Sequence, residues 1–128
     1  MKISKTVEFL HEGGGVTIRL TLQQTGRDLL VLLTGGDAPH VGSVIAAAPR
    51  LSLRGDGISA TSCIINRSGH YDEVPGRRVA ERLAASLNAY VVCACGIHVD
   101  GATSEEIDKV LDCCDRLAEQ AENYLLKK

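Results

Sequence analysis

The chain has 128 residues, enough for one domain spanning residues 1–128 that buries about two thirds of its unfolded-chain surface. Its composition is 45% hydrophobic but only 3% aromatic, and its formal net charge is −2. Such a chain has neither the basic surface nor the aromatic rings on which nucleic-acid binding depends. We therefore expect an aliphatic core and no nucleic-acid partner.

No apolar run approaches the ~20 residues needed to cross a bilayer. The first residues also lack the pattern of a secretory signal. We therefore expect a cytoplasmic protein with no membrane partner. The five cysteines include no Cys-x-x-Cys pair, which disfavours a disulfide scaffold or a zinc ribbon. They are expected to pack as small buried hydrophobic residues.

The first part of the chain has the pattern of β-strands. Thr6–Leu10 is a short, weakly alternating strand, and residues 11–15 form a turn around three consecutive glycines. Val16–Leu22 alternates strictly, which is typical of a half-buried antiparallel strand. Leu29–Thr34 is continuously apolar and is expected to form a central strand covered on both faces.

The remaining elements are predicted in chain order by periodicity and by start and stop signals. They are a strand over Val41–Ala48 that ends at Pro49, a strand over Ile58–Ile65, a helix from about Glu73 to Asn88, a strand over Tyr90–His98, and a last helix capped by Thr103 and Glu106. Several strands followed by helix, strand and helix indicate an α+β domain. We predict a mainly antiparallel β-sheet of about six strands with two helices packed on it.

Three segments that lie far apart in the sequence each place a histidine near a glycine. They are Gly36–Gly42, which contains His40, Gly69–Asp72, which contains His70, and Gly96–Asp100, which contains His98. Side chains alternate along a strand, so His98 and Asp100 are expected to point to the same side. We predict that the fold brings the three segments to one edge, where they line a common cavity.

Histidines and a carboxylate in such a cluster could hold a metal ion, with Asp37 or Asp72 as further ligands. No two histidines have a local spacing such as His-x-x-x-His, so this hypothesis depends entirely on the fold. The alternative is that the histidines bond to the backbone of their own turns. Proton transfer between His98 and Asp100 is a third hypothesis on the same grounds.

The start of the first predicted helix favours an anionic ligand. Arg77 and Arg78 lie in its opening turns, close to Gly69 and Gly76. Backbone N–H groups at a helix N-terminus attract phosphate, and arginine binds phosphate in bidentate fashion. Because basic residues there oppose the helix dipole, the pair suggests a bound anion. The alternative is that both arginines are solvated and pair with Glu73 or Glu81.

The glycine and histidine motifs, together with Thr103–Ile107, resemble the LpdD-like family from about Leu29 to the last helix. These proteins are described as chaperones for prenylated flavin mononucleotide that accompany UbiD-type decarboxylases. The resemblance implies a fold similar to the small proteasome assembly chaperones, which pair as dimers. The length of the last helix and the apolar 41–48 strand are further reasons to expect a dimer.

The resemblance also implies binding without catalysis: the protein would hold prenylated FMN and deliver it to the decarboxylase. The positions that match the family's motifs are His40, His70, Asp72, His98 and Asp100. We add Arg77 and Arg78 to this predicted cofactor-binding set only because they lie at the start of a predicted helix. Two alternatives stay open. One is a homodimeric interaction or assembly chaperone without a small-molecule ligand, and the other is a small metal-dependent enzyme that uses the clustered histidines.

Overall fold

The computed structural model describes residues 6–13, 15–67 and 73–127. Within them, six strands form one sheet with the order β1-β2-β3-β6-β4-β5. The strands are β1 (Thr6–Gly13), β2 (Val16–Thr25), β3 (Asp28–Gly36), β4 (Ser43–Leu51), β5 (Ile58–Asn66) and β6 (Val91–His98). The helices are α1 (Glu73–Leu87) and α2 (Ser104–Leu126). The predicted α+β class, with a mainly antiparallel sheet and two helices, is confirmed.

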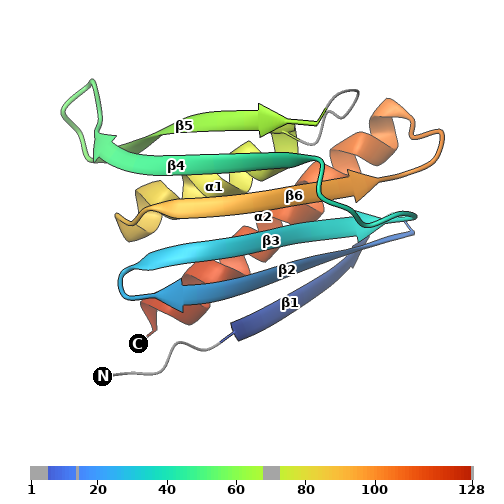
Figure 1. The fold of residues 1–128 in the computed structure, drawn as a ribbon, viewed down its shortest axis with the longest axis horizontal. Coiled ribbons are helices and arrows are strands. Elements are labelled where there is room, and N and C mark those ends of the chain that lie inside the picture. Colours follow the sequence, from blue (N-terminus) through green and yellow to red (C-terminus); the bar gives the residue numbers. More distant parts are fainter. Residues whose placement is uncertain (1–5, 14, 68–72, 128) are drawn as a thin grey trace.

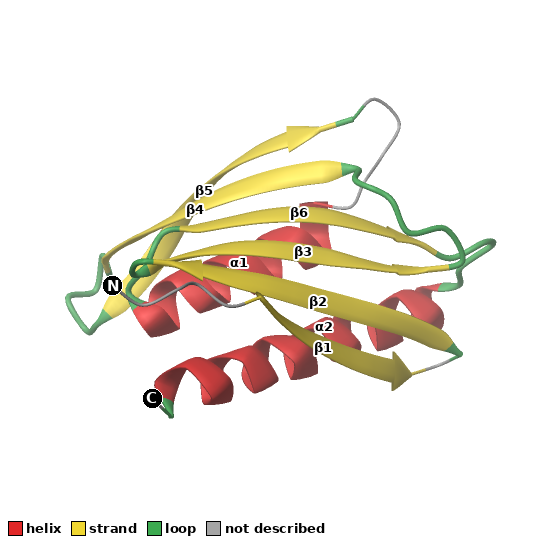
Figure 2. Ribbon diagram, turned by 60° about the horizontal axis from the view of Figure 1, so that its bottom comes forward, coloured by secondary structure: helices red, strands yellow, loops and turns green. Residues whose placement is uncertain are grey.

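The last strand of the chain lies in the middle of the sheet. β6 pairs in parallel with β3 and antiparallel with β4, and the other neighbouring strands are antiparallel. The loop from β3 to β4 therefore passes the carboxyl end of β6, as Figure 1 shows. Both helices lie behind the sheet in this view and below it in Figure 2. The other side, which we call the open face, is not covered by either helix.

The covered face is a continuous apolar core. In β2 the predicted alternation is confirmed, because Val16, Ile18, Leu20 and Leu22 are all buried. These side chains pack with alternate residues of the other strands and with the inner faces of both helices. The fully buried large side chains include Leu33 and Ile45 from the sheet and Leu83 and Leu117 from the helices.

β3 departs from its prediction. Leu29, Val31 and Leu33 are buried, but Leu30 is 50% exposed and Leu32 is 39% exposed. The strand is central, yet helices cover only one of its faces. The prediction that the continuous apolar run is covered on both sides is therefore wrong for this chain by itself.

Two strand boundaries also differ from the sequence analysis. Residues 11–13, expected in a turn, extend β1 because they pair with β2 up to Gly13 and Val16. Pro49, expected to end a strand, lies inside β4 opposite Ala60. Proline is tolerated there because the pairing of β4 with β6 stops at Ala47. Beyond that residue β4 pairs only with β5, so Pro49 lies on an edge of the sheet.

The helices are positioned by a close approach and by ion pairs. Gly76 of α1 packs on Cys95 of β6, where a Cβ would come 2.8 Å from the Cys95 Cβ. In α2 the predicted capping box between Thr103 and Glu106 is confirmed. The ring of Tyr124 meets Phe9 edge-on, with centroids 6.0 Å apart, and so fixes the far end of α2 on β1.

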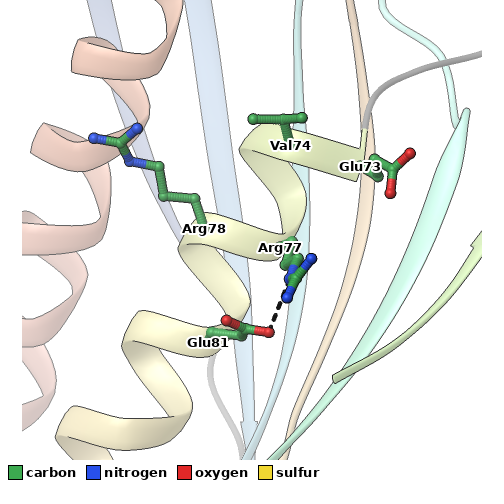
Figure 3. A pocket seen from close by; sticks show the side chains of 5 residues that line it. All are labelled: Glu73, Val74, Arg77, Arg78 and Glu81. Atoms are coloured by element: carbon green, nitrogen blue, oxygen red, sulfur yellow. Dashed lines mark hydrogen bonds and ion pairs between the residues drawn. The ribbon is translucent and has the colours of Figure 1, made fainter. Parts of the chain in front are cut away.

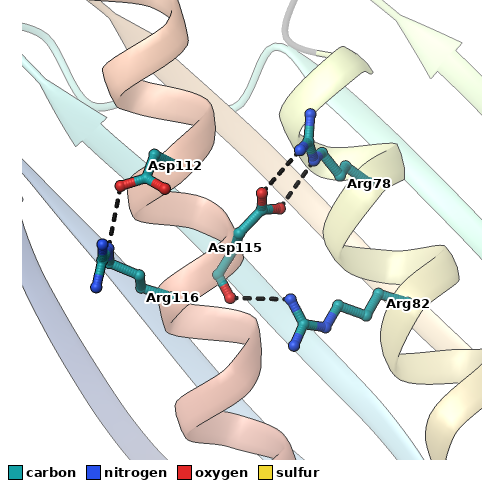
Figure 4. A network of polar contacts seen from close by, with 5 residues as sticks. All are labelled: Arg78, Arg82, Asp112, Asp115 and Arg116. Atoms are coloured by element: carbon teal, nitrogen blue, oxygen red, sulfur yellow. Dashed lines mark hydrogen bonds and ion pairs between the residues drawn. The ribbon is translucent and has the colours of Figure 1, made fainter.

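Ion pairs join the two helices on their outer side, as Figure 4 shows. Arg78 of α1 makes a bidentate contact with Asp115 of α2, at 2.8 and 2.7 Å. Arg82 donates to the Asp115 carbonyl oxygen and to the Glu122 carboxylate, and the hydrogen bond to Glu122 raises the pKa of Arg82. These contacts hold α1 and α2 side by side on the covered face.

All five cysteines are free thiols, as expected. Four of them are buried, but Cys63 on β5 is exposed, so the expectation of burial is wrong at that position. Among the described helices, none is long and apolar enough to cross a membrane.

Candidate functional site

The loop of residues 37–42 lies directly on the carboxyl end of β6. A Cβ at Gly96 would overlap the carbonyl oxygen of His40, so only glycine allows the loop to come this close. The Gly42 amide donates to the Cys95 carbonyl oxygen at 2.9 Å and closes the other end of the contact. Two of the three predicted segments therefore meet, and we call their meeting place, residues 37–42 with 96–100, the histidine end.

A second glycine makes the same junction possible on β3. Gly36 has a φ of +79°, and a Cβ there would overlap the carbonyl oxygen of His98. The next amide, that of Asp37, donates to this oxygen at 2.6 Å. Because β3 and β6 are parallel neighbours, both strands end here and their following loops are locked to each other.

His98 and Asp100 form an exposed pair in this junction. His98 Nε2 lies 2.7 Å from Asp100 Oδ1, with 52% and 80% of the two side chains exposed. The backbone amide of Asp100 donates to Asp37 Oδ2 at 2.9 Å, which orients the Asp100 peptide. The imidazole is thus held by a carboxylate and can exchange a proton or a hydrogen bond with a ligand from the open face.

His40 is the second imidazole at the histidine end. Its Nδ1 lies 2.9 Å from the carbonyl oxygen of Ala38, and since a carbonyl only accepts, this contact favours a proton on Nδ1. The bond to the backbone of its own turn is the alternative that the sequence analysis left open. It fixes the orientation of the ring.

Contacts from β5 and α1 complete this end of the sheet. The Ser43 hydroxyl, buried at 1% exposure, donates to Asn66 Oδ1, and Asn66 Nδ2 donates to Glu73 Oε1 at 3.2 Å. Arg67 is bound to the loop twice. Its amide donates to the Gly42 carbonyl at 2.8 Å, and its Nη1 donates to the Val41 carbonyl at 3.0 Å. We did not predict a part for Ser43, Asn66 or Arg67. Ser43 directly follows the loop, and the antiparallel pairing of β4 with β5 places Asn66 and Arg67 beside it.

The two arginines predicted to bind an anion lie elsewhere. Arg77 and Arg78 line a shallow pocket on the outer surface of α1, shown in Figure 3 with Glu73, Val74 and Glu81. Arg77 Nε pairs with Glu81 at 3.1 Å, and Arg78 pairs with Asp115 of α2. The pairing of Arg77 with Glu81 matches the alternative to a bound anion, whereas the partner of Arg78, Asp115, was not among the carboxylates considered there.

The pocket lies on the helix side of the sheet, and its lining residue Glu73 is bonded to Asn66 at the same end of the sheet as the histidine end. Odd-numbered residues of β6 face the helices, as the contact of Gly76 with Cys95 shows, whereas Gly96 and His98 face the open side. The structure thus brings His40, His98 and Asp100 together and leaves Arg77 and Arg78 apart from them. His70 and Asp72 lie outside the described residues, and their part in the site stays a prediction.

The residue types at the histidine end decide what it could hold. Within residues 6–13, 15–67 and 73–127, no group of three or more His, Cys, Asp or Glu side chains is arranged to hold a metal ion. Imidazoles, backbone amides and a guanidinium instead offer hydrogen bonds to oxygen and nitrogen atoms of an organic ligand. Beside them, Leu32, Ala94 and Val44 stand in one row across three strands of the open face. This apolar row could support a flat, hydrophobic ring.

The histidine end thus joins hydrogen-bonding groups to a half-exposed apolar sheet. The chain matches the model of the prenylated flavin chaperone LpdD-like domain over residues 12–126. It therefore belongs to this family. Among its relatives is Protein LpdD of Lactiplantibacillus plantarum, which is 29% identical over 119 residues covering 91% of this chain and 83% of that protein.

Proposed function

We propose that this protein binds prenylated FMN and delivers it to a UbiD-type decarboxylase, acting as a cofactor chaperone without catalysing a reaction itself. The observation that supports this most is the histidine end, where Gly36 and Gly96 let two loops lock together and bring His40, His98 and Asp100 to one place. Membership of the prenylated flavin chaperone family supports the identity of the ligand. We place the exchange in the cytoplasm.

The residues fit such a ligand in two parts. The pyrimidine part of a flavin ring carries carbonyl oxygens and ring nitrogens, which His40 and His98 can bind as donors or acceptors. The prenylated part is apolar, and the row of Leu32, Ala94 and Val44 next to Gly96 offers it an apolar surface. When bound, the cofactor would supply the chemistry of the decarboxylase, and this chain would only hold and shield it.

We further propose that the protein acts as a homodimer. The open face exposes Leu30, Leu32, Val44 and Val92, each at 38–50%, although they are neighbours in register on β3, β6 and β4. Ile65 continues this surface on β5 and is 74% exposed. Contiguous apolar patches of this kind mark interaction surfaces. A second copy placed face to face would cover the patch and enclose the ligand row.

Titration with reduced prenylated FMN tests the proposed function. A ligand at 100 times its Kd stabilises the fold by about 2.7 kcal/mol, so the melting temperature should rise clearly. His98→Gln should weaken binding, whereas His11→Gln, which changes a histidine of β1, should bind as the wild type does. The loaded protein should then restore activity to an apo-decarboxylase. An unchanged melting temperature at saturating cofactor would rule out the cofactor role.

The open face also favours a second candidate, a homodimeric interaction module without a small-molecule ligand. In that case the apolar patch binds a client protein and the histidine end only locks the loops together. This candidate predicts that the protein binds the decarboxylase equally well with and without cofactor. Binding measured by calorimetry with free and loaded protein separates the two candidates.

A further inference from the structure

The proposed ligand carries a phosphate, and the structure contains nine described arginines that could bind it. Five of them already pair with carboxylates: Arg19, Arg77, Arg78, Arg82 and Arg116. An arginine in an ion pair must give up or share its partner to bind an anion. The two arginines predicted from the helix start are both in this paired group.

The remaining arginines differ in their position along the sheet. Arg27 precedes β3, and Arg50 and Arg54 lie at the end of β4 and in the turn after it. Because β3 runs parallel to β6 and β4 runs antiparallel, all three lie at the end of the sheet opposite to His98. Arg67 follows the end of β5 and lies at the histidine end.

Arg67 is held against the loop of the histidine end. Its backbone amide and its Nη1 are both bonded to carbonyls of the 37–42 loop, at Gly42 and Val41. That same loop lies on Gly96 and carries His40. One N–H of the guanidinium is thus used to fix its position, and the other donors of the planar group are oriented at little further entropic cost.

The charge of the surroundings gives Arg67 a specific role. Asp37, Glu73 and Asp100 are acidic groups at this end of the sheet, yet within the described part of the chain none of them forms an ion pair with Arg67. An anion would therefore be repelled by the carboxylates and attracted by this guanidinium. We propose that Arg67, and not Arg77 or Arg78, binds the phosphate of the ligand and makes the site selective for a phosphate monoester.

This inference rests on the proposed function for its ligand, and FMN and riboflavin, which differ only in the phosphate, test it. In the full-length wild type, FMN should bind at least about tenfold more tightly than riboflavin, as expected for a charge-assisted bidentate contact. Arg67→Gln should remove most of this preference and leave riboflavin affinity unchanged. Arg67→Lys, which keeps the charge but loses the fork, should fall between the two.

Two matched controls accompany these variants. Arg54→Gln removes an exposed arginine from the far end of the sheet, and the double variant Arg77→Gln with Arg78→Gln removes the helix-start pair. Both should keep the preference for FMN. Retained preference in Arg67→Gln, or its loss in the helix-start variant, would overturn the proposal. Circular dichroism of each variant confirms that the fold is intact.

A separate readout distinguishes failure of this inference from failure of the flavin function. The Nε–H signals of the arginine side chains can be followed by NMR during titration with phenyl phosphate. A saturable shift of the Arg67 signal would uphold the phosphate site even if no flavin bound. If the Arg67 signal stays in place while wild-type protein binds FMN, the phosphate is held elsewhere and the assignment falls.

Discussion

The two faces of the sheet are built from the same kinds of residue but serve different purposes. On the covered face, Leu33 and Cys93 are fully buried under the helices. On the open face, their strand neighbours Leu32 and Val92 are 39% and 40% exposed. The first set stabilises the fold of one chain. The second set adds nothing comparable within the chain, so it indicates a surface for a partner or a ligand.

The histidine end lies where the open face stops. There the apolar row is replaced by Gly96 and His98, and the 37–42 loop folds over the strand end. A ligand with an apolar ring and a polar edge would find both surfaces side by side. The contrast between the faces therefore predicts different consequences for substitutions at neighbouring positions of one strand.

The largest effect is expected for a pair of leucines on β3. Leu33→Ala empties a fully buried site and should lower the free energy of unfolding by about 2–5 kcal/mol. Leu32→Ala should lower it by less than about 1 kcal/mol when the chain is monomeric, because this side chain is half-exposed already. Urea unfolding at low protein concentration measures both. Equal losses of unfolding free energy in the two variants would show that the two faces contribute equally to the stability of one chain.

A charge on the open face should disrupt the proposed dimer without unfolding the chain. Leu32→Lys places an ammonium in the centre of the apolar patch and should weaken dimerisation by at least about 100-fold, which is 2.7 kcal/mol. Leu53→Lys is the control, because Leu53 is 94% exposed in the turn after β4 and outside the patch. Sedimentation velocity measures the dissociation. If Leu32→Lys dimerises like the wild type, the interface lies on another surface.

The contact between the loop and β6 predicts a smaller but more specific effect. Gly96→Ala would place a Cβ on the His40 carbonyl, so the 37–42 loop must move away. We expect a stability loss of about 1–3 kcal/mol, typical of overpacking, together with loss of the ligand-induced rise in melting temperature. Ala94→Ser, two positions earlier on the same face, should keep the loop in place. Normal ligand binding by Gly96→Ala would show that the 37–42 loop does not contribute to the ligand site.

Much of the fold could be predicted because its signals are local. The alternation in Val16–Leu22 predicted the buried positions of β2, and Thr103 with Glu106 predicted the start of α2. The exposure of Leu30 and Leu32 could not be predicted. An apolar residue gives the same sequence pattern whether its side chain is buried under the helices of its own chain or is exposed to a second molecule.

The site was predictable to the same degree. The pairing of His98 with Asp100 follows from strand alternation, which acts over two residues. The position of Arg67 beside Gly96 and His98 could not be predicted, because it requires β4 to lie next to β6, which no local pattern specifies. Arg77 and Arg78 were judged from their position along a helix. Glu81, four residues further along the same helix, could be named as a partner from the sequence, whereas Asp115 becomes apparent only once the two helices are packed together.

The last prediction uses the cysteines of the two faces. Burial raises the pKa of Cys93 on the covered face to about 12, while Cys63 on the open side of β5 is exposed. A thiol is neutral when protonated, so the folded state keeps its proton after the unfolded chain has lost it. The resulting stability is complete below the ordinary pKa of cysteine and is lost as the pH rises toward 12.

Each such buried thiol should therefore make the free energy of unfolding fall by about 1.4 kcal/mol per pH unit in this alkaline range. Cys93→Ala should reduce the slope by this amount, and Cys63→Ala is the matched control at an exposed position. Urea unfolding of the wild type and both variants between pH 9 and pH 11 measures the slopes. If Cys63→Ala flattened the curve as much as Cys93→Ala, its thiol would have to be shielded in solution. A second copy covering the open face would provide that shielding, and the effect should then disappear in the Leu32→Lys background.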